Sequence, residues 1–240
     1  MFEPNNDFAL KTHENTFFYI GNYDKALEDF DKSLSIEPNN PFYIESYGSI
    51  YLALESYEKV IVDFTRCLKI KLNNSSALVK RGLAYQKLKQ YNESINDLNQ
   101  LLTIKLYNTY ALLIRGDSFG YMKNYDKALE DFNKTLKIVL NDVSFLIFRK
   151  RIYHIKEEYE SSLKDFNKAL EIQLDNIEGL KDHAEIYLKM TLYKESLLDL
   201  NKVLHINPDN VRCLLLCKRI YFTTKEYELS LEDYDKVLEL

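Results

Sequence analysis

The chain has 240 residues, of which 46% are apolar and 29% are charged. This length and composition exclude a chain that is disordered throughout, and they suit one large or two small globular domains. The net charge of −5 argues against a nucleic-acid partner, because proteins of that class usually present a basic face. Six glycines and four prolines are too few to punctuate an all-β protein, so we expect a mostly helical chain.

The chain shows no signal for export or for a membrane partner. Its longest apolar runs, such as 110–114, are far too short to span a bilayer. The start of the chain lacks the basic and apolar regions of a signal peptide. Its three cysteines are too few for a disulfide framework. We therefore expect a cytoplasmic protein in a reducing environment.

A repeat of 34 residues runs through the sequence without insertion or deletion. Its first marker is a tyrosine, found at Tyr23, Tyr57, Tyr91, Tyr125, Tyr159, Tyr193 and Tyr227. An aspartate follows six residues behind each one, at Asp29, Asp63, Asp97, Asp131, Asp165, Asp199 and Asp233. A leucine completes the set, at Leu34, Leu68, Leu102, Leu136, Leu170, Leu204 and Leu238. Such a period predicts an array of stacked structural units.

Each repeat contains two amphipathic helical patterns. In the third repeat, apolar or small residues three or four apart mark a helix around 78–85, and a second pattern follows over 91–104. Asparagines and prolines stand at the repeat junctions, where helices stop or start. We expect a single array over 7–240, with repeats 7–40, 41–74, 75–108, 109–142, 143–176, 177–210 and 211–240. Residues 1–6 resemble the tail of a truncated preceding repeat.

The period and the residues together resemble the tetratricopeptide repeat. The first helices carry a small residue at Gly48, Gly82, Gly116 and Ala184, and an aromatic residue three positions later. The second helices carry small residues such as Ala26 and Ala128, and aromatic residues at Phe30, Phe64, Phe132 and Phe166. The resemblance implies an all-α fold, a right-handed α-solenoid (superhelix) of about fourteen helices in helix–turn–helix units. It also implies a non-enzymatic scaffold or adaptor that binds a protein or peptide in a concave groove.

Two sets of charged residues are not explained by this pattern: three in the small-residue slot of the first helix, and the aspartate ladder. Lys150, Lys218 and Glu14 occupy the small-residue slot of the first helix. A long charged side chain there should hold paired helices apart or reach the rim, so we expect the loosest packing in repeats 1, 5 and 7. Six of the seven ladder aspartates precede a lysine or arginine by three residues, and we interpret this ladder as solvated i,i+3 charge pairs.

The groove that the resemblance implies would be lined by a stripe separate from the core. Its residues lie three and four apart on the first helices of repeats 3 to 5: Val79, Leu83, Tyr110, Leu113, Asp117, Ile147 and Arg151, with His154 one turn further on. An apolar stripe with charged anchors is typical of an interaction site. The competing interpretation is that these side chains complete helix-to-helix packing.

Some co-chaperones of this family bind a peptide's terminal carboxylates with lysine, asparagine and arginine residues from three first helices. The corresponding slots here hold Lys11, Asn15, Ser46, Ser76 and Lys80. Both serines depart from that pattern, and a lysine in place of an arginine loses bidentate geometry, so solvated polar residues are the favoured interpretation. Head-to-tail self-association through uncapped ends is a second alternative. RNA binding by a related repeat class fits poorly with an acidic chain.

No catalytic motif is evident, and we expect neither enzymatic activity nor a cofactor. Cys213 and Cys217 lie one helical turn apart and could contribute two metal ligands, but no histidine stands at a matching spacing. Core filling is the favoured interpretation of both cysteines.

Overall fold

The structure is a computed structural model that describes residues 17, 20–172 and 177–239. Every element of two or more turns in the described part is an α-helix. Seven of these helices begin at a ladder tyrosine, and we call them second helices: α2 (Tyr23–Ile36), α4 (Tyr57–Ile70), α6 (Tyr91–Ile104), α8 (Tyr125–Ile138), α10 (Tyr159–Ile172), α12 (Tyr193–Ile206) and α14 (Tyr227–Glu239). The first helices alternate with them: α3 (Pro41–Ala53), α5 (Ser75–Lys87), α7 (Thr109–Tyr121), α9 (Val143–Ile155), α11 (Ile177–Lys189) and α13 (Val211–Thr223). Each first helix begins at the residue where the sequence period starts a repeat.

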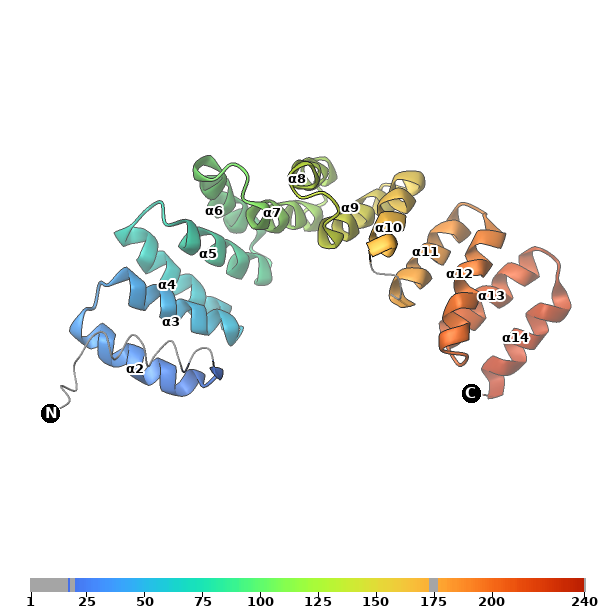
Figure 1. Cartoon of the computed structure of the whole chain (residues 1–240), viewed down its shortest axis with the longest axis horizontal. Helices are drawn as coiled ribbons and strands as arrows, with labels where there is room; N and C mark the ends of the chain where they lie inside the picture. Colours follow the sequence, from blue (N-terminus) through green and yellow to red (C-terminus); the bar gives the residue numbers. More distant parts are fainter. Residues whose placement is uncertain (1–16, 18–19, 173–176, 240) are drawn as a thin grey trace. The chain divides into compact units, whose positions relative to one another are not determined.

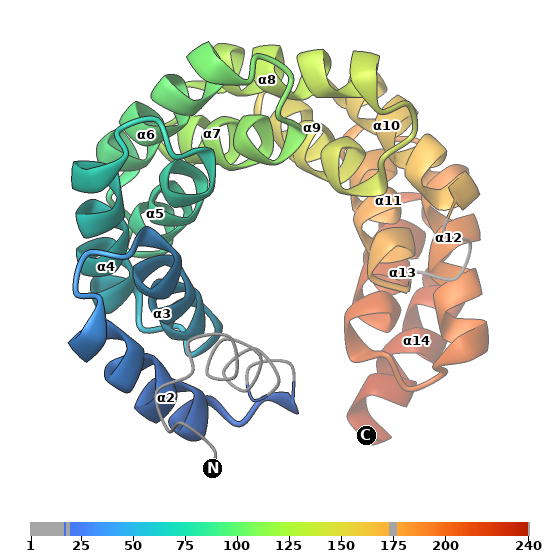
Figure 2. The same ribbon diagram turned by 60° about the vertical axis from the view of Figure 1, so that its left-hand side comes forward.

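The chain forms two compact units, residues 1–135 and 136–240, which we call the N-terminal and C-terminal units. The division falls within the last turn of α8. In each unit, helices that follow one another in sequence pack against one another. Within the N-terminal unit, α3, α5 and α7 lie side by side in one layer, and α4 and α6 lie in the other (Figures 1 and 2). The C-terminal unit has the same two layers, with α9, α11 and α13 in one and α10, α12 and α14 in the other (Figure 2).

Asparagine and aspartate side chains define where most first helices begin. The capping side chains accept hydrogen bonds from backbone N–H groups of the first turn, and they belong to Asn40, Asn74, Asn108, Asp142 and Asn210. These bonds satisfy donors that a helix start otherwise leaves unpaired. Two positions after the last residue of each first helix, a residue with positive φ reverses the chain into the second helix: Glu55, Lys89, Lys123, Glu157, Thr191 and Lys225. The turn geometry therefore repeats although none of these residues is glycine.

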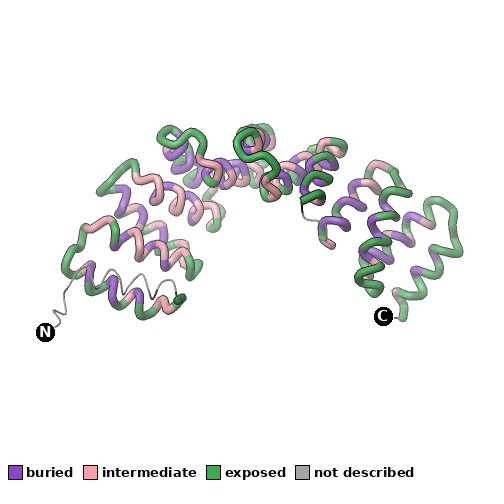
Figure 3. The backbone as a smooth tube through the Cα atoms, viewed as in Figure 1, coloured by how far each residue is buried: buried purple, intermediate pink, exposed green. Residues whose placement is uncertain are grey.

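Close contact within each helix pair depends on the small residue of the first helix. A Cβ atom added at Gly116 would lie 2.7 Å from Cε1 of Phe132, and one added at Gly48 would lie 3.0 Å from Cε2 of Phe64. Glycine therefore lets the aromatic ring of the second helix reach the backbone of the first. Buried positions alternate with exposed ones along the helices of both units (Figure 3).

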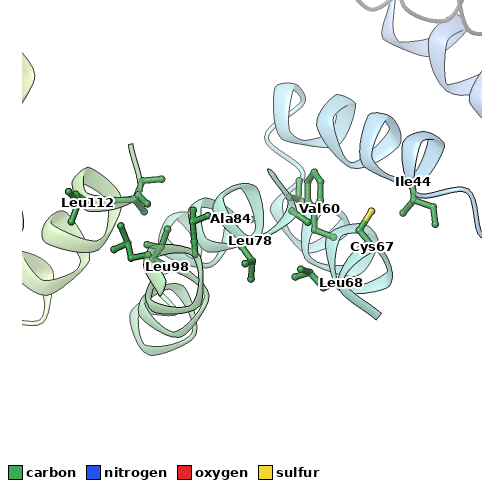
Figure 4. Close-up of a cluster of buried hydrophobic side chains, with 14 residues drawn as sticks. Ile44, Val60, Cys67, Leu68, Leu78, Ala84, Leu98 and Leu112 are labelled. Atoms are coloured by element: carbon green, nitrogen blue, oxygen red, sulfur yellow. The ribbon is translucent and has the colours of Figure 1, made fainter. Parts of the chain in front are cut away.

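The largest core cluster of the N-terminal unit joins five consecutive helices, α3 to α7. It includes Ile44 of α3, Val60 of α4, Leu78 of α5, Leu98 of α6 and Leu112 of α7, all almost completely buried (Figure 4). A corresponding cluster in the C-terminal unit surrounds Cys213 and Cys217. Burial of this kind between repeats explains why no single helix pair needs a core of its own.

The expectation of loose packing in repeats 5 and 7 is wrong. The α9–α10 and α13–α14 pairs pack as extensively as α5–α6. The Lys150 side chain lies over the Phe166 ring, with Nζ 4.7 Å from the centroid, and its ammonium reaches Asp182. Lys218 similarly lies 4.1 Å from the centroid of Tyr234. Each lysine contacts an aromatic ring of the partner helix, so its side chain takes part in the packing of the pair. Glu14 of repeat 1 lies outside the described residues.

The interpretation of the aspartate ladder as solvated charge is also wrong. Six of its members are buried, namely Asp29, Asp97, Asp131, Asp165, Asp199 and Asp233. Three of them form bidentate ion pairs with an arginine of the preceding first helix: Arg81 with Asp97, Arg115 with Asp131, and Arg149 with Asp165. The arginines recur every 34 residues, like the aspartates. Lysine pairs at i,i+3 are present at Asp29, Asp199 and Asp233.

Asp63, also in the N-terminal unit, has neither an arginine nor a lysine in an ion pair within the described residues. Tyr47 occupies the slot that Arg81 fills one repeat later, and Asp63 makes no ion pair within the described part of the chain. Burial raises the pKa of Asp63 to about 6, against the weaker opposing effect of Arg66 and Lys59. Removal from water disfavours the ionised carboxylate, and no hydrogen-bonded cation offsets that cost.

Candidate binding surface on the first helices

The predicted groove residues of the N-terminal unit all lie on α5 and α7. Val79 and Leu83 are partly buried and pack against the core cluster, so part of their surface serves helix packing. Tyr110, in the first turn of α7, is 49% exposed. Asp117 accepts a hydrogen bond of 2.9 Å from Nε2 of Gln86, which links α7 to α5. Leu113 is intermediate in burial. The exposed apolar surface of this stripe is therefore centred on Tyr110.

The predicted groove residues of the C-terminal unit border a pocket between α9 and α11. Ile147 and Arg151 are both exposed, and His154 lies one turn after Arg151. The pocket has a volume of about 200 Å³. Its α11 wall consists of Asp182, Glu185 and the buried Ile186. Sequence reasoning missed the whole α11 wall, because in repeat 6 the slot equivalent to Ile147 is held by the charged Lys181.

Ion pairs hold the walls of this pocket in place. Nζ of Lys150 lies 2.6 Å from Oδ2 of Asp182, which joins α9 to α11. Glu185 accepts hydrogen bonds of 3.1 and 2.5 Å from Nε and Nη2 of Arg212, which joins α11 to α13. Because both carboxylates already have cationic partners, the pocket is not an anionic site.

The slots of the carboxylate clamp are only partly described. Lys11 and Asn15 lie outside the described residues, whereas Ser46 and Ser76 are half-buried on α3 and α5. The ammonium of Lys80 donates a 2.8 Å hydrogen bond to Oγ of Ser49 and lies 3.8 Å from Oε1 of Glu45. A ligand carboxylate at Lys80 would compete with Glu45 for the ammonium.

The cysteines are core residues with protonated thiols. Cys67, Cys213 and Cys217 are completely or almost completely buried. Burial raises the pKa of Cys67 and of Cys217 to about 12, and it raises the pKa of Cys213 as well. Among the described residues, no group of three or more histidine, cysteine, aspartate or glutamate side chains could hold a metal ion. No helix in the described ranges is long and apolar enough to cross a membrane.

Successive helix pairs, packed in two layers through small-to-aromatic contacts, define a helical-repeat solenoid. Family models of the tetratricopeptide repeat match residues 15–40, 75–108 and 151–176, and a second model of that description matches 110–138. The chain is a tetratricopeptide repeat protein, as its sequence predicts. Proteins of this class are generally protein–protein interaction modules.

Several solved structures share this fold. A tetratricopeptide repeat protein from Parabacteroides merdae is 22% identical, with a TM-score of 0.72 over 95% of this chain and 90% of that one. The C-terminal part of a repeat protein from Cytophaga hutchinsonii is 16% identical, with a TM-score of 0.82 over 95% and 94%. YrrB, described as having an unusual peptide-binding site, is 14% identical, with a TM-score of 0.65 over 77% and 95%. No curated protein matches the sequence.

Proposed function

We propose that this chain is a non-enzymatic scaffold that binds a protein or peptide segment on the exposed face of its first helices. The observation that carries the proposal is the pocket between α9 and α11, which lies beside the predicted residues Ile147 and Arg151. In the N-terminal unit, the half-exposed Tyr110 offers a second apolar contact on the same kind of surface. Aromatic and aliphatic side chains surrounded by charge are typical of interaction sites. The peptide-binding site named for YrrB supports the choice of a peptide ligand.

A pull-down with two matched double variants tests this proposal. Tyr110→Glu/Ile147→Glu places one charge on the first-helix face of each unit, at side chains that are 49% and 41% exposed. The control, Val62→Glu/Leu198→Glu, places one charge on the second-helix face of each unit, at side chains that are 67% and 61% exposed. We expect partners kept by the parent and the control to be lost only from the first variant. Circular dichroism must show equal helicity and melting for all three chains.

The opposite result would contradict the proposal. If both double variants keep the same partners, or if only the second-helix variant loses them, the binding surface is not on the first helices. Quantitative mass spectrometry of the captured proteins distinguishes these outcomes, because each partner is compared with itself across the three chains.

The two alternatives remain predictions with their own tests. A clamp that uses Lys11, Asn15 and Lys80 predicts that affinity for an acidic C-terminal peptide falls with salt and is lost when its C-terminus is amidated. Head-to-tail self-association predicts an apparent mass that rises with concentration in light scattering. Leu231 and Leu238, seven residues apart on α14, are 61% and 68% exposed, and this apolar surface favours head-to-tail self-association.

A further inference from the structure

One face of α14 exposes apolar side chains that the other second helices bury. Leu231 and Leu238 are 61% and 68% exposed, whereas Ile95 and Leu102, in the same slots of α6, are 8% and 6% exposed. Tyr234 is 39% exposed, whereas every other side chain in its slot is at most 4% exposed: Phe30, Phe64, Leu98, Phe132, Phe166 and Leu200. The three α14 residues lie three and four apart and share one helix face, which we call the α14 stripe.

In the other repeats, the first helix that follows covers this stripe. Leu98 and Leu102 of α6 belong to one core cluster with Leu112 of α7. Leu200 of α12 belongs to one cluster with Cys213 of α13. The internal repeat therefore identifies the kind of segment that fits the α14 stripe, an amphipathic helix with the apolar spacing of a first helix.

The covering helix also brings an arginine to one fixed slot of the second helix. Nη1 of Arg81 on α5 donates a 2.9 Å hydrogen bond to Oγ1 of Thr65 on α4. Nη1 of Arg115 on α7 donates a 2.7 Å hydrogen bond to Oδ1 of Asn99 on α6. On α14 this slot holds Asp235, which is exposed. A carboxylate in this slot strengthens the hydrogen bond from an arginine, because both groups are charged.

Asp235 belongs to a row of four carboxylates beside the α14 stripe. The row is spaced four, three and four residues apart and consists of Glu228, Glu232, Asp235 and Glu239. All four are exposed, and none of them forms an ion pair within the described ranges. The lysine of this helix, Lys236, is instead paired with Asp233. No other second helix has an acid in all four slots of the row, so α14 favours a cationic partner.

We propose that α14 docks an amphipathic helix of a partner protein, with lysine and arginine beside its apolar face. The apolar side chains of that helix cover the α14 stripe, and its arginine pairs with Asp235. The stripe alone would also suit a second copy of this chain, but the charges oppose it. The first-helix sequence of repeat 1, residues 7–20, contains two acidic residues and one lysine, with His13 in the arginine slot. This surface is separate from the first-helix face, so the inference goes beyond the proposed function.

Two peptides taken from this chain serve as probes. The α5 sequence, 75–87, has three basic and no acidic side chains, whereas the α7 sequence, 109–121, has one of each. Both carry an arginine three residues after a leucine. Each peptide is stapled as a helix, because isolated helices of this length are marginal in water. In fluorescence anisotropy with the full chain, the α5 peptide should bind about fivefold more tightly or more, and high salt should reduce the difference.

A matched pair of variants tests the apolar contact. Leu231→Ser should weaken binding of the α5 peptide about tenfold, because a leucine that is buried on docking is removed. Leu198→Ser, at a side chain of the same 61% exposure on α12, should change the affinity less than about twofold. Circular dichroism must show the helicity and melting of the parent for both variants.

The charged contact has its own matched pair. Glu232→Gln/Asp235→Asn should weaken binding of the α5 peptide about fivefold. Glu28→Gln/Asp31→Asn makes the same changes at exposed residues in the same slots of α2 and should have little effect. Replacing the arginine of the peptide by glutamine should weaken binding to the parent, but much less to the Asp235→Asn variant. Such a double-mutant cycle isolates the pair.

Several results would overturn the inference. They are equal binding of the two peptides, no binding of the α5 peptide, and equal effects of a variant and its control. Additive effects in the double-mutant cycle would exclude the arginine–Asp235 pair. If light scattering shows that the chain self-associates and that Leu231→Ser abolishes this, the occupant is a second copy and the inference is wrong. The first-helix face is tested separately by the pull-down.

Discussion

The same substitution should have opposite effects at two slots of the aspartate ladder. Asp63 is half-buried without an arginine partner, whereas Asp97 forms a bidentate pair with Arg81 at 2.7 Å for both bonds. Asp63→Asn removes a carboxylate that is costly to ionise, and Asp97→Asn removes the partner of a largely buried guanidinium. We therefore expect the first variant to be more stable than the parent at pH 7 and the second to be less stable.

The magnitude for Asp63 follows from its pKa. A rise from 3.8 to about 6 corresponds to about 3 kcal/mol of unfavourable free energy for the ionised form. Because Asp63 is only partly buried, solvent screening reduces this to about 1–2 kcal/mol. A raised carboxyl pKa means that the folded state binds more protons, so this group's contribution to stability falls as pH rises from about 4 to about 6. The gain from Asp63→Asn should be near zero below pH 4 and constant above pH 6.

For Asp97→Asn we expect a loss of about 3 kcal/mol, the lower end of the cost of breaking a buried ion pair. The asparagine keeps one acceptor, and Arg81 keeps its 2.9 Å hydrogen bond to Oγ1 of Thr65. Urea unfolding of both variants at pH 3.5, 5 and 7 measures the midpoints, and hydrogen exchange locates the change within the N-terminal unit. A pH-independent effect of Asp63→Asn, or a stabilising effect of Asp97→Asn, would refute the argument.

Three further predictions concern the packing, the turns and the thiols. Gly116→Ala should destabilise the fold by about 1–3 kcal/mol, because the new Cβ would lie 2.7 Å from the ring of Phe132, and a urea titration measures the loss. Lys123→Gly should stabilise it by up to about 1 kcal/mol, because Lys123 has a φ of 60°, and a thermal melt measures the gain. Cys67 and Cys217 should react with a thiol reagent only on unfolding, because burial raises the pKa of both thiols to about 12, and a colorimetric thiol assay at pH 8 checks this.

The sequence period predicted the helical architecture well, because every repeat uses the same local chemistry. The ladder tyrosines mark the starts of the second helices, and the capping asparagines precede most first helices. The arginine–aspartate ladder was missed although a signal was present. Arg81, Arg115 and Arg149 share the 34-residue period and precede their aspartates by sixteen residues. A pairing between the two helices of a repeat was therefore readable from the two ladders together.

The binding surface was less predictable, because it depends on where individual side chains lie. The α11 wall of the pocket comes from a repeat whose sequence lacks the apolar stripe, and Ile186 lines the pocket from a core position. Lys150 was expected to disturb packing, yet its pair with Asp182 joins the two helices beside the pocket. Such contacts depend on side-chain directions that helical periodicity does not specify.

The most direct test of the account is site-specific photo-crosslinking. A photoreactive phenylalanine analogue replaces Tyr110 or Ile147 on the first helices, or Val62 or Leu198 on the second helices, one position at a time. The account predicts that a bound partner protein cross-links from the first two positions and not from the other two. Cross-links only from Val62 and Leu198, or equal yields from all four positions, would contradict the claim that the first helices bind the partner.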